Sequence, residues 1–424
     1  MLNPVAFGLF LAGYFNLSKL IHYDIFMLRP PGQNLAEKDI RLAGLDHLRA
    51  LAITLVFLFH YRLFAHPAWL DTAGSFGWTG VDLFFVLSGY LIAGQLFRQV
   101  AVYNTIDIRS FFVKRFFRII PAYLVVLALY FFVPAFRERE ALSPSWKFLT
   151  FTQNFGLDLG KYGTFSHAWS LCIEEQFYFL LPFLVMGVLS LKWGKKAALL
   201  LGGLFIAGFL FRLISWYQFV EPHSETGSFG LAWYQWIYYP TYNRLDGLIT
   251  GVSIAGICQF FPRMRIFIFS NGNALLISGI VLITAACFLC ADPYTFKASI
   301  FGFPLVAIAY GCILAAVISP SCFIFRFKLK STAAIAALSY AVYLTHKGII
   351  HITQVQLGKL GIEKDGNFMF VLCIITVLAG ALLLRILIEK PFIKMKAGIL
   401  DNRKNINKKL QPGKLPLRSL NARS

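Results

Sequence analysis

The chain has 424 residues, of which 58% are hydrophobic and only 14% are charged, whereas soluble proteins carry roughly 25% charged residues. So little polar surface cannot coat a water-soluble protein of this length, which excludes a soluble globular fold. The net charge of +20 is not evidence of nucleic-acid binding, because the basic residues cluster in short stretches between apolar segments. That pattern is typical of membrane proteins.

Apolar segments long enough to cross a bilayer recur along the chain, and a helix needs about 20 such residues to do so. We therefore expect an all-α polytopic membrane protein whose ten transmembrane helices form one bundle. The expected spans are 46–64, 78–97, 118–136, 170–191, 197–219, 241–261, 270–291, 299–319, 332–352 and 367–388.

The distribution of Lys and Arg orients these spans. Of the 40 basic residues, 28 fall in the segments that would face one side of the membrane, 8 in those that would face the other, and four within spans. Since cytoplasmic loops are the richer in Lys and Arg, both termini are predicted to be cytoplasmic.

The two ends of the chain differ from the expected transmembrane domain, residues 45–392. Residues 1–44 form an N-terminal extension in which 4–21 are apolar but interrupted by polar residues. They are compatible with an interfacial helix or an extra span, and we favour the interfacial helix. Residues 393–424 are basic and polar, so a disordered cytoplasmic tail near anionic lipid headgroups is expected.

The first span carries two ionisable residues on one face. Arg49 and His60 are eleven residues apart, close to three helical turns, which places His60 about 16 Å further along the helix. Asp46 is expected to cap the start of this helix. The alternatives are that Arg49 and Asp46 only anchor the helix at the membrane boundary, and that His60 is a hydrogen-bonded packing residue.

Small residues at 77, 80, 88, 89 and 94 mark the second span. They permit close helix packing, although Ser88 also suits a catalytic role. Asp82 is expected near the external end of this span, where it could face His60 and orient its ring.

The segment before the third span is the strongest basic cluster, and Pro121 is expected to begin that span. Arg115 and Arg118 are one helical turn apart, so both can contact one phosphate group, for which Arg is well suited. The alternative is ordinary cytoplasmic positive charge.

Glu174 and Glu175 stand at the expected external head of the fourth span, where a helix dipole accounts for one acidic residue but not for two. Arg244 and Asp246 are expected to pair with each other or with these glutamates.

His346, in the ninth span, is read by default as a packing histidine. The seven cysteines lack metal-ligand spacing, so no metal site is expected.

Five ordered blocks of this sequence resemble acyltransferase family 3, the membrane proteins that O-acylate bacterial surface glycans. The resemblance covers about residues 41–392. The blocks are LDHLRALAITLVFLFH (45–60), GVDLFFVLSGYLIAG (80–94), RFFRIIPAYL (115–124), HAWSLCIEEQFYFLLP (167–182) and SYAVYLTH (339–346).

This resemblance implies an enzyme of the bacterial cytoplasmic (inner) membrane. It would take an acyl group, most simply acetyl, from cytoplasmic acyl-CoA as co-substrate, with no tightly bound cofactor. The acceptor would be a hydroxyl of an extracytoplasmic glycan such as lipopolysaccharide O-antigen, exopolysaccharide or peptidoglycan.

The same resemblance assigns roles to individual residues. Donor binding would fall to Arg49, Arg115 and Arg118, and catalysis to His60, Glu174, Glu175 and His346. Asp82 joins the catalytic candidates by analogy with catalytic triads, in which an acidic residue fixes the imidazole tautomer. A positioned base is needed to make a hydroxyl attack a thioester, and His is the side chain tuned nearest neutral pH. Whether His60 deprotonates the sugar or carries the acyl group itself stays open.

Two other classes of protein remain compatible with buried Arg, Glu and His residues. A ten-span transporter or flippase of a lipid-linked or anionic saccharide would also need them, although no inverted repeat is evident. A non-catalytic sensor or assembly subunit would not require Arg49 and His60 to share a helix face.

Overall fold

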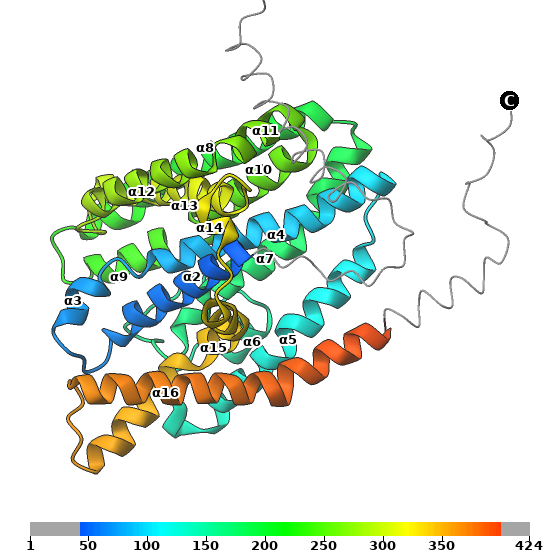
Figure 1. The fold of residues 1–424 in the computed structure, drawn as a ribbon. Coiled ribbons are helices and arrows are strands. Elements are labelled where there is room, and N and C mark those ends of the chain that lie inside the picture. The colour runs from blue at the N-terminus through cyan, green and yellow to red at the C-terminus, as the bar shows by residue number, and fades with distance from the viewer. Residues whose placement is uncertain (1–42, 400–424) are drawn as a thin grey trace, which may run out of the picture. The chain divides into compact units, whose positions relative to one another are not determined.

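The computed structural model describes residues 43–399, and the structural statements below concern that segment. Within it every regular element is helical (Figure 1). The long helices are α2 (Ala43–Tyr61), α4 (Thr79–Tyr103), α5 (Ile108–Phe132), α7 (Trp169–Ser190), α8 (Ala197–Ser215), α10 (Asp246–Phe260), α12 (Gly272–Leu289), α13 (Phe303–Val317), α15 (Lys330–Lys359) and α16 (Asn367–Leu384). The short ones are α3 (Trp69–Ala73), α6 (Ser145–Leu149), α9 (Phe229–Trp233), α11 (Pro262–Ser270) and α14 (Phe323–Arg326).

The described segment contains 9 helices that are long and apolar enough to cross a membrane, or 10 if one bent pair is counted as a span. Each overlaps one of the ten expected spans, so the all-α polytopic fold is confirmed. The interfacial helix expected at 4–21 and the tail beyond residue 399 lie outside the described residues. At the C-terminal side, helix continues to Ile399, so the start of the expected disordered tail is helical.

Two spans differ from expectation for local reasons. Helix α5 begins at Ile108, ten residues before the expected start, because Asp107 caps it by accepting a hydrogen bond from the Ser110 N–H at 3.0 Å. The basic cluster therefore lies on the helix, and Pro121 lies inside it. Helix α10 begins at Asp246, five residues after the expected start, because Thr241–Asn243 form a separate short 3-10 helix. Its end before Pro262 agrees with the expected span, and α11 leaves it at 108°, since proline cannot continue the hydrogen-bond ladder.

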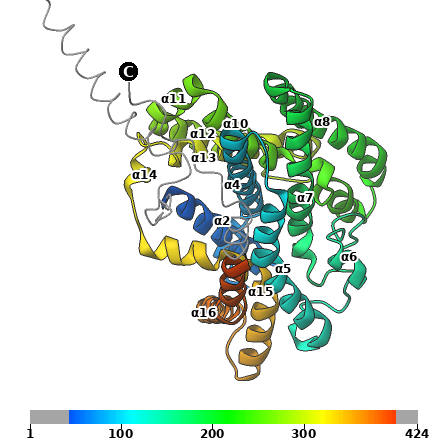
Figure 2. The same ribbon diagram turned by 90° about the vertical axis from the view of Figure 1, so that its right-hand side faces the viewer.

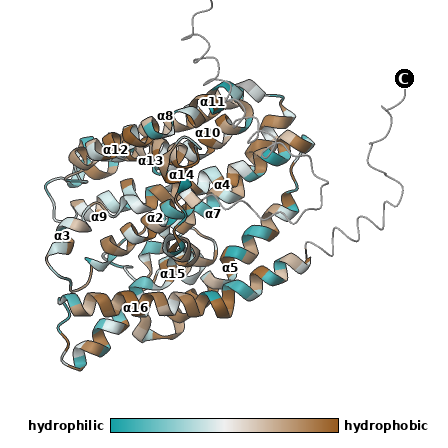
Figure 3. Ribbon diagram, viewed as in Figure 1, coloured by the Kyte–Doolittle hydropathy of each residue, from teal (hydrophilic) through white to brown (hydrophobic). Residues whose placement is uncertain are grey.

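The helices form an inner and an outer group (Figures 2 and 3). In the apolar span that contains α13, 72% of the residues are buried by protein, whereas this share is 11% for the span containing α8 and 22% for those containing α12 and α16. The apolar side chains that the outer helices leave exposed are those that lipid would cover. Helix α2 packs against both α4 and α15, and this brings elements from the two ends of the segment together.

Small residues bring α4 and α10 close together, as expected for the second span. A Cβ atom on Gly89 would lie 2.2 Å from the Leu248 carbonyl oxygen, and one on Gly251 would lie 2.1 Å from that of Val86. Either distance is a clash, so these positions require glycine. Gly94 faces open space, and the prediction of close packing fails there.

Candidate active site

Three histidines from three separate elements meet inside the bundle. His60 comes from the last turn of α2, His346 from α15, and His167 from the short helix η2 (Ser166–Ala168) that leads into α7. Their ring centroids are 4.9 Å apart for His60 and His346, 4.9 Å for His167 and His346, and 5.7 Å for His60 and His167. All three rings are buried. We call them the histidine cluster.

Hydrogen bonds assign the tautomers of two of these rings. His346 Nδ1 lies 3.0 Å from the Val342 carbonyl oxygen and 2.9 Å from that of Tyr343, and a carbonyl only accepts, so Nδ1 carries the hydrogen. His60 Nδ1 likewise donates to the Val56 carbonyl oxygen at 3.0 Å, and it lies 3.1 Å from His346 Nε2. His346 Nε2 therefore accepts from His60 Nδ1. The lone pair of His60 then lies on Nε2, the atom that can act as a base.

His167 was not singled out from the sequence, although it stands in the same block as the two glutamates. It is only 2% exposed, and neither ring nitrogen forms a hydrogen bond of normal geometry with any described residue. Its backbone is held more firmly, because the Tyr343 hydroxyl donates to the His167 carbonyl oxygen. A buried imidazole that lacks a hydrogen bond of normal geometry, next to two other imidazoles, is the signal that only the structure supplies.

A buried ion pair adjoins the histidine cluster. Lys347 Nζ lies 2.8 Å from Glu138 Oε1, and the two side chains are 4% and 3% exposed. Lys347 also donates to Ser166 Oγ at 3.4 Å, and Glu138 Oε1 accepts from the Phe165 N–H at 3.1 Å. Because a buried charge must be paired, this contact ties α15 to the segment after α5 and to the turn before His167.

The two glutamates lie deeper than expected. The first turn of α7 contains no acidic residue, and Glu174 follows His167 by seven residues, which is about 10 Å along a helix. Ser88 Oγ donates to Glu174 Oε1 at 2.7 Å. The expectation that the glutamates sit at the helix head and interact with its dipole was therefore wrong, because η2 and the first turn of α7 come before them.

Arg115, on α5, is the basic residue that faces these glutamates. Its guanidinium lies 5.5 Å from the centroid of the Tyr178 ring, donates to Gln95 Oε1 at 3.4 Å, and is within electrostatic range of Glu174 and Glu175. Its neighbour Arg118 is exposed. Arg115 is thus half-buried and Arg118 is exposed, and both are within electrostatic range of Glu174.

Arg49 lies on α2, eleven residues before His60 and nearer the N-terminal end of the helix. Its Nη1 is 3.8 Å from Asp46 Oδ1. Asp46 is itself in the first turn of α2 rather than at its N-cap, because the helix already begins at Ala43.

Asp82 does not orient His60. Both of its carboxylate oxygens accept from Arg244 Nη2, at 3.0 and 3.1 Å. Arg244 is packed against three aromatic rings, of which Phe303 is the nearest at 4.0 Å. Asp246, expected to pair with Arg244 or the glutamates, instead accepts from Arg212 Nη1 at 2.7 Å. These two buried pairs join α4, α8 and α10, and this is why Asp82 is directed away from the histidine cluster.

Polar groups of α7 and α15 form a continuous face between the glutamates and the histidine cluster. His167, Ser170 and Glu174 are spaced three and four residues apart, and so share one side of their helix. Ser170 Oγ lies 2.5 Å from the Tyr343 hydroxyl, which in turn donates to the His167 carbonyl oxygen.

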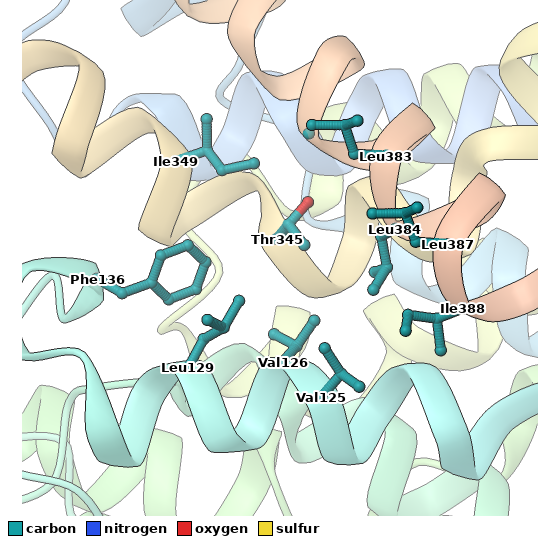
Figure 4. Close-up of a pocket in the computed structure, with 11 residues that line it drawn as sticks. Val125, Val126, Leu129, Phe136, Thr345, Ile349, Leu383, Leu384, Leu387 and Ile388 are labelled. Atoms are coloured by element: carbon teal, nitrogen blue, oxygen red, sulfur yellow. The ribbon is translucent and has the colours of Figure 1, made fainter.

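An apolar pocket of about 270 Å³ lies between α5, α15 and α16 (Figure 4). Its wall is hydrocarbon apart from Thr345, and the Thr345 hydroxyl is already bonded to the Ala341 carbonyl oxygen at 2.8 Å. Such a pocket suits an aliphatic chain but offers no reactive group, whereas the histidine cluster offers a basic nitrogen.

The fold and these buried groups define a multi-pass membrane protein with an ionisable site inside its helix bundle. Comparison with known protein families identifies the family of this chain. The family described as "Acyltransferase domain", acyltransferase family 3, matches residues 42–386. The chain therefore belongs to acyltransferase family 3 and is a member of a family of acyl-transferring enzymes.

Curated bacterial relatives are similar over 73% of this chain. The peptidoglycan O-acetyltransferase OatA of Listeria monocytogenes is 28% identical over 334 residues, and the O-acetyltransferase OatA of Staphylococcus aureus is 30% identical over 332 residues. The chain spans about half the length of these relatives, 49% and 50% respectively. No solved structure shows significant similarity to it.

Proposed function

We propose that this protein transfers an acetyl group from cytoplasmic acetyl-CoA to a hydroxyl of an extracytoplasmic glycan, in a bacterial cytoplasmic membrane with both termini in the cytoplasm. The observation that carries the proposal is the bond between His60 and His346, which leaves a basic nitrogen inside the bundle. The names of the relatives support an O-acetyl product, and that of the Listeria protein supports a peptidoglycan-type acceptor.

The donor would enter from the side that carries most of the Lys and Arg residues. CoA is an anionic nucleotide, and Arg118 is exposed on α5 while Arg115 points inward toward the glutamates. Arginine gives charge-assisted, two-point contacts to phosphate. Arg49 lies about 16 Å from the level of His60 along α2, so the extended arm of CoA, rather than its nucleotide, would reach the histidine cluster.

The acceptor would meet the acetyl group at His60. Its Nε2 would remove the proton from the glycan hydroxyl as the oxygen attacks the thioester carbonyl, a role typically worth about 10²–10⁴ in rate. His346 Nε2, by accepting from His60 Nδ1, holds the base in the tautomer that this step requires.

The test uses the 424-residue chain in lipid nanodiscs with radiolabelled acetyl-CoA and a soluble peptidoglycan fragment bearing free hydroxyls. Wild type should transfer label to the glycan, and His60→Ala should lose at least about 10²-fold in kcat. His351→Ala is the matched control, since it removes a histidine of α15 outside the cluster. Full transfer by His60→Ala would refute the assigned base, and saccharide movement without acetylation would support a transporter instead.

A further inference from the structure

The roles given so far do not use His167, although its ring contacts both other members of the histidine cluster. Buried polar atoms are almost always hydrogen-bonded, and each exception calls for an explanation. Here neither nitrogen of one ring forms a hydrogen bond of normal geometry within residues 43–399, and its contact with the Leu344 backbone is only a weak one.

Packing alone does not account for an imidazole at this position. The His167 ring centroid lies 5.0 Å from that of Phe165, 5.6 Å from that of Tyr343 and 6.5 Å from that of Tyr130. A phenyl ring would suit these aromatic neighbours without burying two polar atoms. A ring nitrogen of His167 that lacks a strong hydrogen bond within the protein is suited to form one with a substrate bound at the histidine cluster.

The other two rings restrict what that bond can be. Both nitrogens of His346 and the Nδ1 of His60 are already engaged, which leaves His60 Nε2 and the two nitrogens of His167. The engaged nitrogens also argue against a three-histidine metal site, because a metal would need their lone pairs. An imidazole carries one N–H when neutral and two when charged, so His167 always has a ring donor, on a ring whose centroid lies 5.7 Å from that of His60.

The turn that presents His167 is fixed in advance. Phe165 has φ of 53°, in the left-handed region that a bulky residue rarely adopts. Its N–H donates to Glu138 Oε1 at 3.1 Å and its carbonyl oxygen accepts from Gln153 Nε2 at 3.2 Å. With the Tyr343 hydroxyl on the His167 carbonyl, this strained turn is held from several sides. Such preorganisation is what makes a hydrogen-bond donor effective in catalysis.

We propose that His167 is a catalytic residue that donates its ring N–H to the carbonyl oxygen of the acyl thioester as that oxygen becomes negatively charged. This inference rests on the proposed function. In the step, the glycan hydroxyl oxygen bonds to the thioester carbon while its proton passes to His60 Nε2, and His167 stabilises the oxyanion. The intermediate then re-forms its carbonyl as the carbon–sulfur bond breaks, and the leaving thiolate takes the proton from His60, giving the ester and free thiol.

The experiment measures kcat and KM for acetyl-CoA in four variants: His167→Phe, His167→Ala, His167→Asn and His167→Gln. Removing one oxyanion donor typically lowers kcat about 10²–10³-fold, and we expect that loss in the Phe and Ala variants with KM changed less than threefold. An amide can donate in place of one ring nitrogen, so Asn or Gln should keep at least tenfold more kcat than Ala. His351→Phe, an imidazole-to-phenyl change on α15 outside the cluster, should leave kcat unchanged.

A packing role predicts the opposite order, with Phe best tolerated and the amides worst. The inference is overturned if His167→Phe keeps wild-type kcat, or if both amide variants fall to the level of His167→Ala. Should the Phe variant fail to fold, the comparison of Asn and Gln with Ala still decides. Absence of any transfer by wild type would refute the proposed function itself, whereas loss only in the His60 variant would refute the role of His167 alone.

Discussion

His346 Nε2 lies 3.1 Å from His60 Nδ1, so α15 supplies a partner for the histidine at the end of α2. This contact joins residues that are 286 positions apart. It converts two separate buried histidines into an ordered pair in which only one nitrogen keeps a free lone pair.

The first prediction follows from that pair. His346→Leu removes one of the two acceptors of the His60 Nδ1 hydrogen and leaves only the Val56 carbonyl oxygen to fix the tautomer. We expect kcat to fall about 10²–10⁴-fold, the upper end being the loss measured when a base is held in the wrong tautomer. His346→Gln retains an acceptor oxygen and should recover at least tenfold of that loss. Steady-state kinetics with saturating acetyl-CoA measures both, and equal activity in the two variants would show that hydrogen bonding to His60 is not what His346 contributes.

The second prediction concerns Lys347 and Glu138. Removing one member of a buried ion pair costs roughly 3–5 kcal/mol, whereas replacing both with apolar residues is often neutral. Lys347→Met and Glu138→Leu should therefore each lower the midpoint of thermal unfolding, and the double variant should recover most of the loss. The exposed Lys297→Met is the control for removal of a lysine. Additive losses in the double variant would mean that the two side chains do not act as a pair.

The third prediction separates Asp82 from catalysis. Since both oxygens of Asp82 are bound by Arg244, Asp82→Asn should destabilise the packing of α4 against α10 without removing a group from the histidine cluster. We expect a lower unfolding midpoint and a kcat within about fivefold of wild type for the folded fraction, far less than the 10²–10⁴ due to a general base. A large fall in kcat with unchanged stability would restore Asp82 to a catalytic role.

The fourth prediction concerns the donor site. One charge-assisted hydrogen bond contributes about 1.5–3 kcal/mol, so Arg118→Ala should raise the KM for acetyl-CoA roughly tenfold or more and leave kcat nearly unchanged. Arg115→Lys should also raise it, because lysine cannot reproduce a two-point contact. Arg263→Ala, which removes an exposed arginine from α11, is the control. Equal effects from Arg118 and Arg263 would indicate a general loss of surface charge rather than a donor site.

The sequence predicted what depends on local composition. The spans were found because each is a continuous apolar segment, and the close packing at Gly89 because small residues permit it. Hydropathy does not predict the early start of α5, because its first turns carry charges, and the local signal for that start is the Asp107 cap. His60 and His346 were named individually, and their catalytic roles stay predictions.

Partners between distant elements could not be predicted. Asp82 and Arg244 are 162 positions apart, and Arg212 and Asp246 are 34 apart, so no helical spacing pairs them. The same holds for Lys347, whose partner comes from the segment after α5. Charge complementarity restricts which residues can pair, but only the packing of the bundle decides which of several buried acids meets which base.

The last prediction tests the orientation on which the route of the donor depends. The uneven distribution of Lys and Arg predicts that the segment between α7 and α8 lies in the cytoplasm and that the segment between α12 and α13 lies outside. In a variant lacking the seven native cysteines, a cysteine at Lys297 should react with a membrane-impermeant maleimide in intact spheroplasts. A cysteine at Lys192 should react only after permeabilisation. The reverse pattern would place the Arg115 and Arg118 side of the bundle outside, where acetyl-CoA is not available, and the proposed direction of transfer would then be wrong.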